Sequence, residues 1–203
     1  MESDNHYYAE GYSPENDPYI MENGVLINKL GLSDTQSLNL IELRITSLEV
    51  ERLLSAPAPV TFDVQYLRDL HYQIFHKVYP WAGELRKVDI GKNDTMFLAH
   101  TKIESELNAL FSWLANNQFL TGATHEDFSQ KVGEYLVLLN FIHPFREGNG
   151  RTQRLLISRI AQNAGITLDW RAVSNDAMRK ACIDGINGNT RNMVRLILLN
   201  SKK

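Results

Sequence analysis

Residues 143–154 read HPFREGNGRTQR, and this stretch separates two apolar segments that have helical periodicity. Gly148 and Gly150 are suited to such a junction, because glycine adopts backbone conformations that other residues avoid. A junction alone does not require a histidine, a glutamate and three arginines within twelve residues. The stretch therefore predicts both the point where two helices meet and a site of chemistry.

The composition is that of a soluble globular protein. Of 203 residues, 43% are hydrophobic and 22% are charged, which suits one domain with a full-sized core. The formal net charge of −3 gives no support to a general nucleic-acid-binding role. Cys182 is the single cysteine, so no internal disulfide can form, and no apolar run is long enough to span a membrane. We expect a cytoplasmic protein without membrane contact.

Hydrophobic periodicity predicts an all-α fold preceded by an irregular arm. Residues 1–32 are polar and contain turn-forming pairs such as Asn23-Gly24, so we expect an arm there and one helical domain over residues 33–203. Thr124 and Ser174 are expected to cap two of the helices. Apolar residues recur at helical spacing over about 33–55, 63–78, 102–117, 125–142, 151–163, 175–186 and 190–200.

The first predicted helix is rich in leucine. Ser33 and Gln36 have the spacing of a capping box, which places the start of the helix there. We expect its leucines to form the buried side, namely Leu40, Leu43, Leu48, Leu53 and Leu54.

The hydrophobic period changes between residues 85 and 97. Leu85, Val88 and Ile90 precede the turn-forming run Gly91-Lys92-Asn93-Asp94, and Met96-Phe97 follows it. This pattern predicts a short β-hairpin, the one hairpin in the fold.

The motif has the features of an anion site. The N-terminus of a helix presents unpaired N–H groups and partial positive charge, and glycines let a bulky anion approach the backbone closely. Arg151 and Arg154 are three residues apart, so both can reach one phosphate chain. Phe145 is expected in the core, where it anchors the loop. The motif therefore predicts a seat for the phosphates of a nucleotide.

Two further side chains indicate which reaction this phosphate-binding site could catalyse. Glu147 would sit beside phosphate, which is tolerable with a divalent cation between them, and Mg²⁺ uses one or two carboxylates together with phosphate oxygens. His143 can take a proton at neutral pH from a hydroxyl that attacks phosphorus. The motif thus predicts phosphoryl or nucleotidyl transfer.

Each feature alone has a plainer explanation. A histidine at a helix end is often a cap, a glycine turn before arginines is often the solvated start of a helix, and a lone glutamate is usually on the surface. Their combination within twelve residues favours the phosphate site. Direct nucleic-acid binding is not expected, because the other basic residues are scattered and lack interleaved aromatics. A zinc hydrolase is disfavoured by the absence of H-E-x-x-H and of a Cys/His cluster.

The motif resembles the signature of Fic-domain proteins, H-x-F-x-[D/E]-G-N-G-R-x-x-R, without departure at any fixed position. The stretch YLRDLHYQIFHKVYPWAGELRKVDI at 66–90 resembles the helix upstream of that signature and the first hairpin strand. The resemblance covers about residues 17–200. It implies the Fic fold, a single helical domain with a hairpin called the flap, and transfer of AMP from ATP to a protein hydroxyl.

The resemblance also implies a role for each motif residue. His143 resembles the general base that deprotonates a Ser, Thr or Tyr of the target, and Glu147 resembles the Mg²⁺ ligand. Phosphate contacts are implied for Asn149, Arg151 and Arg154, of which Arg154 would hold the γ-phosphate, and for the backbone N–H groups of Gly148 and Gly150. The flap, whose edge would pair with an extended segment of the target, comprises Lys92, Asn93, Asp94, Met96 and Phe97.

Regulation of such enzymes commonly uses an inhibitory helix, [S/T]-x-x-x-E-[G/N], whose glutamate pairs with the second arginine of the signature. Glu10-Gly11 fails this pattern because His6 stands where Ser or Thr is required, and Glu22-Asn23 fails because of Pro18. No glutamate follows Glu147. We therefore expect the inhibitor to be a separate antitoxin.

The arm supports this expectation. DPYIMENGVLINKLGL at 17–32 resembles the family branch whose toxins are paired with separate antitoxins. The resemblance to that branch implies the ATPase subunits of gyrase and topoisomerase IV as targets. Two alternatives stay open at this point: transfer of another phosphate-linked group, such as UMP or phosphocholine, and a non-catalytic nucleotide-binding module.

Overall fold

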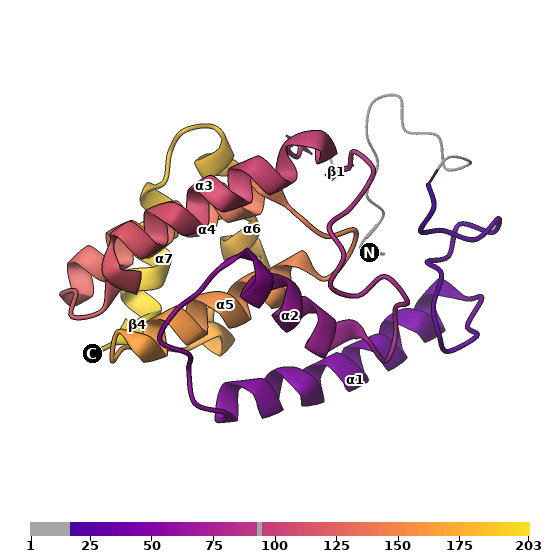
Figure 1. The fold of residues 1–203 in the computed structure, drawn as a ribbon, viewed down its shortest axis with the longest axis horizontal. Coiled ribbons are helices and arrows are strands. Elements are labelled where there is room, and N and C mark those ends of the chain that lie inside the picture. Colours follow the sequence, from indigo (N-terminus) through magenta and orange to yellow (C-terminus); the bar gives the residue numbers. More distant parts are fainter. Residues whose placement is uncertain (1–16, 93–94) are drawn as a thin grey trace.

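The computed structural model describes residues 17–92 and 95–203, and its architecture is all-α (Figure 1). Two short antiparallel pairings accompany the helices: β1 (Gly91–Lys92) with β2 (Thr95–Met96), and β3 (Thr167–Leu168) with β4 (Ser201–Lys202). The all-α fold with a small hairpin is confirmed. The helices are α1 (Thr35–Ser55), α2 (Val64–Phe75), α3 (Ile103–Asn116), α4 (His125–Ile142), α5 (Asn149–Asn163), α6 (Asn175–Ile186) and α7 (Arg191–Asn200).

Helix α4 is the centre of the fold. It contacts α3, α5, α6 and α7, while α5 also contacts α1 and α2. In Figure 1, α1 runs along the bottom of the molecule, with α3 and α4 above it. Gly133 allows α4 and α7 to approach closely, because a Cβ on this residue would lie 2.9 Å from the Cα of Val194. The motif joins α4 to α5, so its loop lies between two of the most enclosed helices.

Most predicted helix ends agree with the structure. Thr124 accepts from the backbone N–H of Asp127 at 3.2 Å, and Ser174 caps α6. The capping box predicted at Ser33 is wrong, because Asp34 is the cap and its carboxylate accepts from the backbone N–H of Ser37 at 2.7 Å. Helix α5 begins at Asn149, two residues earlier than predicted, so its first turn takes in part of the glycine-rich segment.

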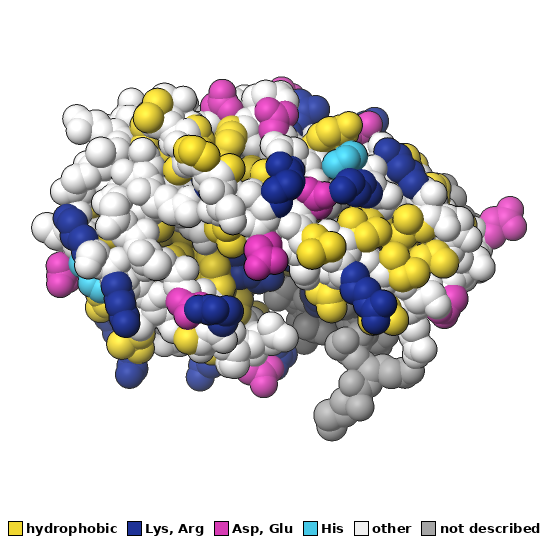
Figure 2. All heavy atoms as spheres, turned by 90° about the horizontal axis from the view of Figure 1, so that it is seen from below, with side chains coloured by type: hydrophobic (Ala, Val, Ile, Leu, Met, Phe, Trp, Pro, Cys, Tyr) yellow, Lys and Arg dark blue, Asp and Glu magenta, His cyan; other side chains and the backbone are white. Residues whose placement is uncertain are grey.

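The buried face of α1 differs from the prediction. Leu40, Leu43 and Leu48 are 52%, 56% and 69% exposed, Leu54 is half-buried, and Leu53 is the one predicted leucine that is buried. The inward face instead carries Leu38, Glu42, Thr46, Glu49 and Leu53. Figure 2 views the molecule from below and shows hydrophobic side chains gathered on the side where α1 lies. Carboxylates turn inward because basic side chains of the protein meet them there.

The described part of the predicted arm packs on the helical body. Tyr19 and Val25 are buried, and the ring of Tyr19 meets the ring of Trp81 edge-on with centroids 5.4 Å apart. The backbone N–H of Lys29 donates to the carbonyl of Val78 at 2.8 Å. The segment is irregular, with a single bridge between Ile20 and Leu26. It shares the core of the helices, while the boundary at residue 32 stays a prediction.

The hairpin is shorter than predicted. Residues 85–90 are not a strand, because the backbone N–H of Arg86 donates to the carbonyl of Pro144 at 2.9 Å and not to a neighbouring strand. The pairing of β3 with β4 was not predicted, since each strand has two residues and their partners are far apart in sequence. Across residues 17–92 and 95–203, no helix combines the length and apolar character needed to cross a membrane.

Candidate active site

The loop that links α4 to α5 is closed by one asparagine. The side-chain oxygen of Asn149 accepts from the backbone N–H of Phe145 at 2.9 Å, and its amide donates to the Phe145 carbonyl at 2.7 Å. Phe145 is 1% exposed, as expected of an anchor, and stacks on the ring of His71 with centroids 3.9 Å apart. Asn149 therefore fixes the loop, and its contact with phosphate stays a prediction.

His71 packs against the loop between α4 and α5, and its role was not predicted from the sequence. The backbone N–H of Gly83 donates to its Nδ1 at 2.8 Å, so the ring proton lies on Nε2, which donates to the carbonyl of Glu147 at 3.0 Å. Burial lowers the pKa of His71 to about 3, so the ring is neutral at neutral pH. A histidine in an apolar helix has no sequence pattern that reveals this role.

The start of α5 contains two glycines, at positions where an added Cβ would lie close to neighbouring side chains. Gly148 has φ of +83°, and a Cβ there would lie 2.3 Å from Cζ of Phe75. Gly150 is helical, and a Cβ there would lie 3.3 Å from Nη1 of Arg154. The N-terminus of α5 thus presents backbone N–H groups with the guanidinium of Arg154 beside them, the arrangement expected of an anion site.

Arg151 and Arg154, two of the three arginines of the motif, differ in their surroundings. Burial lowers the pKa of Arg154, and the neighbouring charge of Arg151 lowers it further. Within residues 17–92 and 95–203, no side chain forms a hydrogen bond or ion pair with the Arg154 guanidinium. Two neighbouring guanidinium groups favour binding of an anion to both of them.

Arg151 is held by α1. Its Nη2 donates to Oε1 of Glu42 at 2.6 Å, and its Nη1 donates to the hydroxyl of Thr46 at 2.9 Å. The guanidinium also lies over the ring of Phe75, 4.7 Å from the centroid. Residues of α1 more than one hundred positions earlier in the chain therefore orient Arg151 within the motif.

Glu42 is a second site residue that sequence reasoning missed. It is 5% exposed, and burial raises the pKa of its carboxyl, while the charge of Arg151 acts in the opposite direction. The predicted buried face of this helix consisted of leucines and did not include Glu42. The helical spacing of Glu42 and Thr46 is the one signal that they share a face.

Glu147 lies at the mouth of the anion site. Its side chain is 24% exposed, its Oε1 accepts from the backbone N–H of Gly148 at 2.8 Å, and it lies 3.7 Å from Nη2 of Arg151. Across the part of the chain that the structure describes, no three His, Cys, Asp or Glu residues form a cluster that could hold a metal. A lone carboxylate beside a phosphate seat fits Mg²⁺ that is bound mainly by a nucleotide.

His143 ends α4 in a left-handed conformation, with φ of 46° and ψ of 63°. Its Nδ1 lies 3.0 Å from the carbonyl of Asn140, and a carbonyl only accepts, so the proton is on Nδ1 and Nε2 is the basic nitrogen. Burial lowers the pKa of His143 to about 3, which keeps the imidazole neutral. A neutral ring with a basic Nε2 is the form that a general base requires.

The hairpin lies against this histidine. The ring of Phe97 stacks on the His143 ring with centroids 3.7 Å apart. Gly91 pairs with Met96 and Lys92 with Thr95, and Met96 is 45% exposed. Asn93 and Asp94 lie outside the described residues. The structure thus brings Phe97 of the predicted flap to the predicted base, while target docking by the flap stays a prediction.

The comparisons with known proteins identify the family. Residues 61–161 match the model of the Fic/DOC family. The chain is 31% identical over 181 residues to the probable protein adenylyltransferase Fic of Salmonella typhimurium, covering 89% of this chain and 90% of that protein. This chain belongs to the Fic/DOC family. The predicted resemblance is confirmed.

Other relatives agree with this assignment. The protein adenylyltransferase VbhT of Bartonella schoenbuchensis is 38% identical over 190 residues, which are 93% of this chain and 40% of that protein. This chain therefore spans less than half the length of that relative. The BepC protein of Bartonella tribocorum with bound AMPPNP superposes with a TM-score of 0.84 at 28% identity, covering 91% of this chain and 96% of that one. Several curated relatives of this Fic/DOC chain are named protein adenylyltransferase, and this chain is an enzyme of that class.

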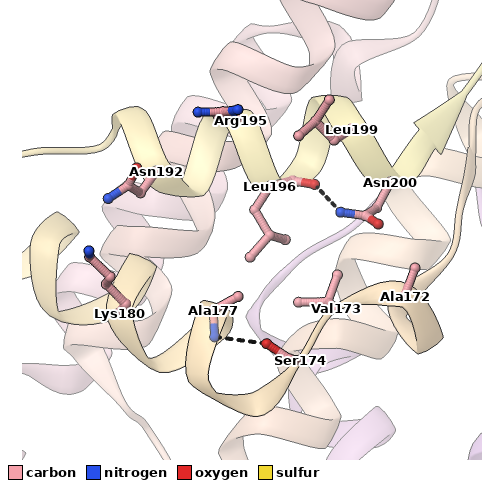
Figure 3. Close-up of a pocket in the computed structure, with 10 residues that line it drawn as sticks. All are labelled: Ala172, Val173, Ser174, Ala177, Lys180, Asn192, Arg195, Leu196, Leu199 and Asn200. Carbon is pink, nitrogen blue, oxygen red and sulfur yellow. Dashed lines mark hydrogen bonds between the residues drawn. The ribbon is translucent and has the colours of Figure 1, made fainter.

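A shallow cavity of about 340 Å³ lies elsewhere, between α6 and α7 (Figure 3). Leu196 points into it, and Lys180 and Arg195 stand at its edges. None of its lining residues belongs to the motif. This cavity is therefore separate from the motif.

Proposed function

We propose that this chain transfers AMP from ATP to a Ser, Thr or Tyr hydroxyl of a target protein. The observation that carries the proposal is a neutral histidine with a basic Nε2 at one end of a loop whose other end is an open helix N-terminus. The curated relatives named protein adenylyltransferase, 30–38% identical over most of this chain, support the same chemistry.

The triphosphate of ATP would bind at the start of α5. Backbone N–H groups from Asn149 to Arg151 would supply donors, joined by that of Gly148 once it is released from Glu147, and Arg154 would supply positive charge. Arg151, already held by Glu42 and Thr46, keeps further N–H groups for phosphate because a guanidinium has five donors. These positive groups stabilise the charge that develops on phosphate during transfer.

Glu147 is the residue that would hold Mg²⁺, which supplies charge neutralisation for the triphosphate when bound. Its carboxylate is partly exposed and tied by one oxygen to the N–H of Gly148.

His143 would act on the attacking hydroxyl. The hydroxyl oxygen forms a bond with the α-phosphorus of ATP, and the bond from that phosphorus to the bridging β-oxygen breaks. The hydroxyl proton moves to Nε2 of His143, and pyrophosphate leaves. The Nδ1–H group of His143 would donate to the Asn140 carbonyl throughout the reaction, and this hydrogen bond would hold the ring in place.

We further propose that the protein is a cytoplasmic bacterial toxin held inactive by a separate antitoxin. The absence of a described side-chain partner for Arg154 supports this proposal, because a glutamate from another chain can occupy that position. The ATPase subunits of gyrase and topoisomerase IV are the proposed targets, on the resemblance of residues 17–32 to that branch.

The test is to incubate the purified chain with bacterial lysate, Mg²⁺ and ATP labelled on the α-phosphate. A protein band labelled from the α-phosphate, absent with γ-labelled ATP and absent with His143→Ala, is the expected result. A band from γ-labelled ATP alone would indicate transfer of the γ-phosphate and would exclude AMP transfer. A band from labelled UTP alone would reassign the transferred group to UMP.

A further inference from the structure

Arg86 is a buried arginine behind the proposed base, and it lies outside the motif. It is 2% exposed. Its Nε donates to the carbonyl of His143 at 2.8 Å, and its Nη2 donates to the carbonyl of Ile142 at 3.3 Å. Its backbone N–H donates to the carbonyl of Pro144 at 2.9 Å. One residue thus holds three consecutive residues at the end of α4.

The same side chain holds both flanks of the hairpin. Nη1 of Arg86 donates to the carbonyl of Val88 at 2.6 Å, before β1, and Nη2 donates to the carbonyl of Leu98, after β2. The carboxylate of Asp89 lies 3.7 Å from Nη1 and supplies a counter-charge. The planar guanidinium therefore links the hairpin to α4 through several fixed donors, as the arginine fork allows.

The C-terminus of α4 explains why a cation is placed there. The last four carbonyls of a helix lack partners within it, and that end carries partial negative charge. In α4, the Asn140 carbonyl accepts from Nδ1 of His143 at 3.0 Å, and the Phe141 carbonyl accepts from the backbone N–H of Leu98 at 3.0 Å. Ile142 is paired with Arg86. The partners of this helix end are therefore the proposed base, the hairpin flank and Arg86.

We propose that Arg86 is a positioning residue that fixes His143 and the target-docking flap relative to each other. The inference rests on the proposed function, because it takes His143 as the base and the hairpin as the docking element of one reaction. The donors that would hold the nucleotide lie at the start of α5 and make no contact with Arg86. Loss of Arg86 therefore lowers the rate of transfer and leaves nucleotide affinity in place.

The variant Arg86→Lys tests this. Lysine keeps the positive charge but has a single nitrogen, which cannot reach the helix end and both hairpin flanks together. We expect the affinity for Mg–AMPPNP, measured by calorimetry, to stay within about threefold of the unmodified protein, while the rate of AMP transfer falls about 100-fold, the loss typical of a 1 Å misplacement.

Arg159→Lys is the matched control. Arg159 is 4% exposed and also donates to backbone carbonyls, those of Ala56 and Pro57, but it contacts neither His143 nor the hairpin. Its transfer rate is expected to be unchanged. An Arg86→Lys protein that is folded and transfers AMP like the control would overturn the proposal, and so would parallel loss of AMPPNP binding and transfer.

A readout without catalysis separates this inference from the proposed function. In ¹⁵N-histidine NMR spectra, His143 is expected as a single Nδ1–H tautomer in the unmodified protein, and as an altered or exchange-broadened signal in Arg86→Lys. An unaltered His143 signal would contradict positioning by Arg86. In the unmodified protein, rapid solvent exchange of the Arg86 Nε–H or the Leu98 amide would also contradict it, whether or not the variant folds. Failure of the unmodified protein to transfer AMP would count against the proposed function alone.

Discussion

Single residues of the motif are constrained by packing as well as by chemistry. Gly148 has a positive φ and faces the ring of Phe75, and that ring also lies beneath Arg151. Glycine is therefore required at position 148 for two reasons: it adopts the positive φ, and it leaves room for the Phe75 ring.

Gly148→Ala is expected to lower the free energy of unfolding by about 2–4 kcal/mol, since a strained φ adds to an overlap with Phe75. Gly165→Ala is the control, with φ of +73° and no atom within 4 Å of an added Cβ. It is expected to cost only about 1 kcal/mol. Urea unfolding of both variants gives the comparison, and equal losses would show that the Phe75 contact does not constrain Gly148.

Glu42 is expected to contribute to stability through Arg151. Glu42→Ala leaves the partly buried guanidinium without its main counter-charge, so we expect a loss of about 2–3 kcal/mol, below the usual cost of breaking a fully buried pair. Glu51→Ala on the exposed face of the same helix is the control, with an expected change within about 0.5 kcal/mol. Thermal unfolding distinguishes them, and a neutral Glu42→Ala would mean that Arg151 is held by Thr46 and Phe75 alone.

At the scale of secondary-structure elements, the rotation of helix α1 about its axis depends on the residues that it contacts. Helix α1 has leucines around much of its circumference, so its sequence permits more than one inward face. The face that turns inward is the one whose carboxylates meet Arg151 and Lys77. Pairing of these buried carboxylates favours this rotation of the helix, because an unpaired carboxylate inside the protein is costly.

A pair of leucine variants measures this rotation. Leu38→Ala removes a side chain that is 2% exposed and is expected to cost about 2–5 kcal/mol, while Leu43→Ala, at 56% exposed, is expected to stay within about 0.5 kcal/mol. Urea unfolding midpoints of the two proteins test the difference. A larger loss for Leu43→Ala would support the rotation predicted from sequence and contradict the structure.

At the scale of the whole molecule, the fold encloses two neutral histidines, His143 in the motif and His71 packed against it. Burial lowers the pKa of both His71 and His143 to about 3. In the unfolded chain their pKa is about 6.5, so below that value the unfolded state binds more protons than the folded one. Stability is therefore full above pH 6.5 and is lost as the pH falls from 6.5 toward 3.

We expect each of these histidines to lower the free energy of unfolding by about 1.4 kcal/mol at one pH unit below 6.5. His71→Gln, whose amide can both donate and accept, is expected to remove half of this pH dependence between pH 7.5 and 5.5. His76→Gln, at a half-buried position outside the site, is expected to leave it unchanged. Urea unfolding at the two pH values measures the slopes, and an unchanged slope in His71→Gln would show that His71 is protonated in the folded state.

The sequence by itself determined the helical class, most helix ends, the hairpin and the family. These features depend on local spacing, such as the caps at Thr124 and Ser174 or the unbroken motif from His143 to Arg154, and local spacing is fully present in the chain. The tertiary structure decided which face of α1 is buried, how Arg151 is held, and where the proton of His143 lies. It also brought Arg86, His71 and Glu42 to the site from outside the motif. Their roles arise from contacts between segments far apart in sequence, and each contact is stable only because the surrounding core excludes water from it.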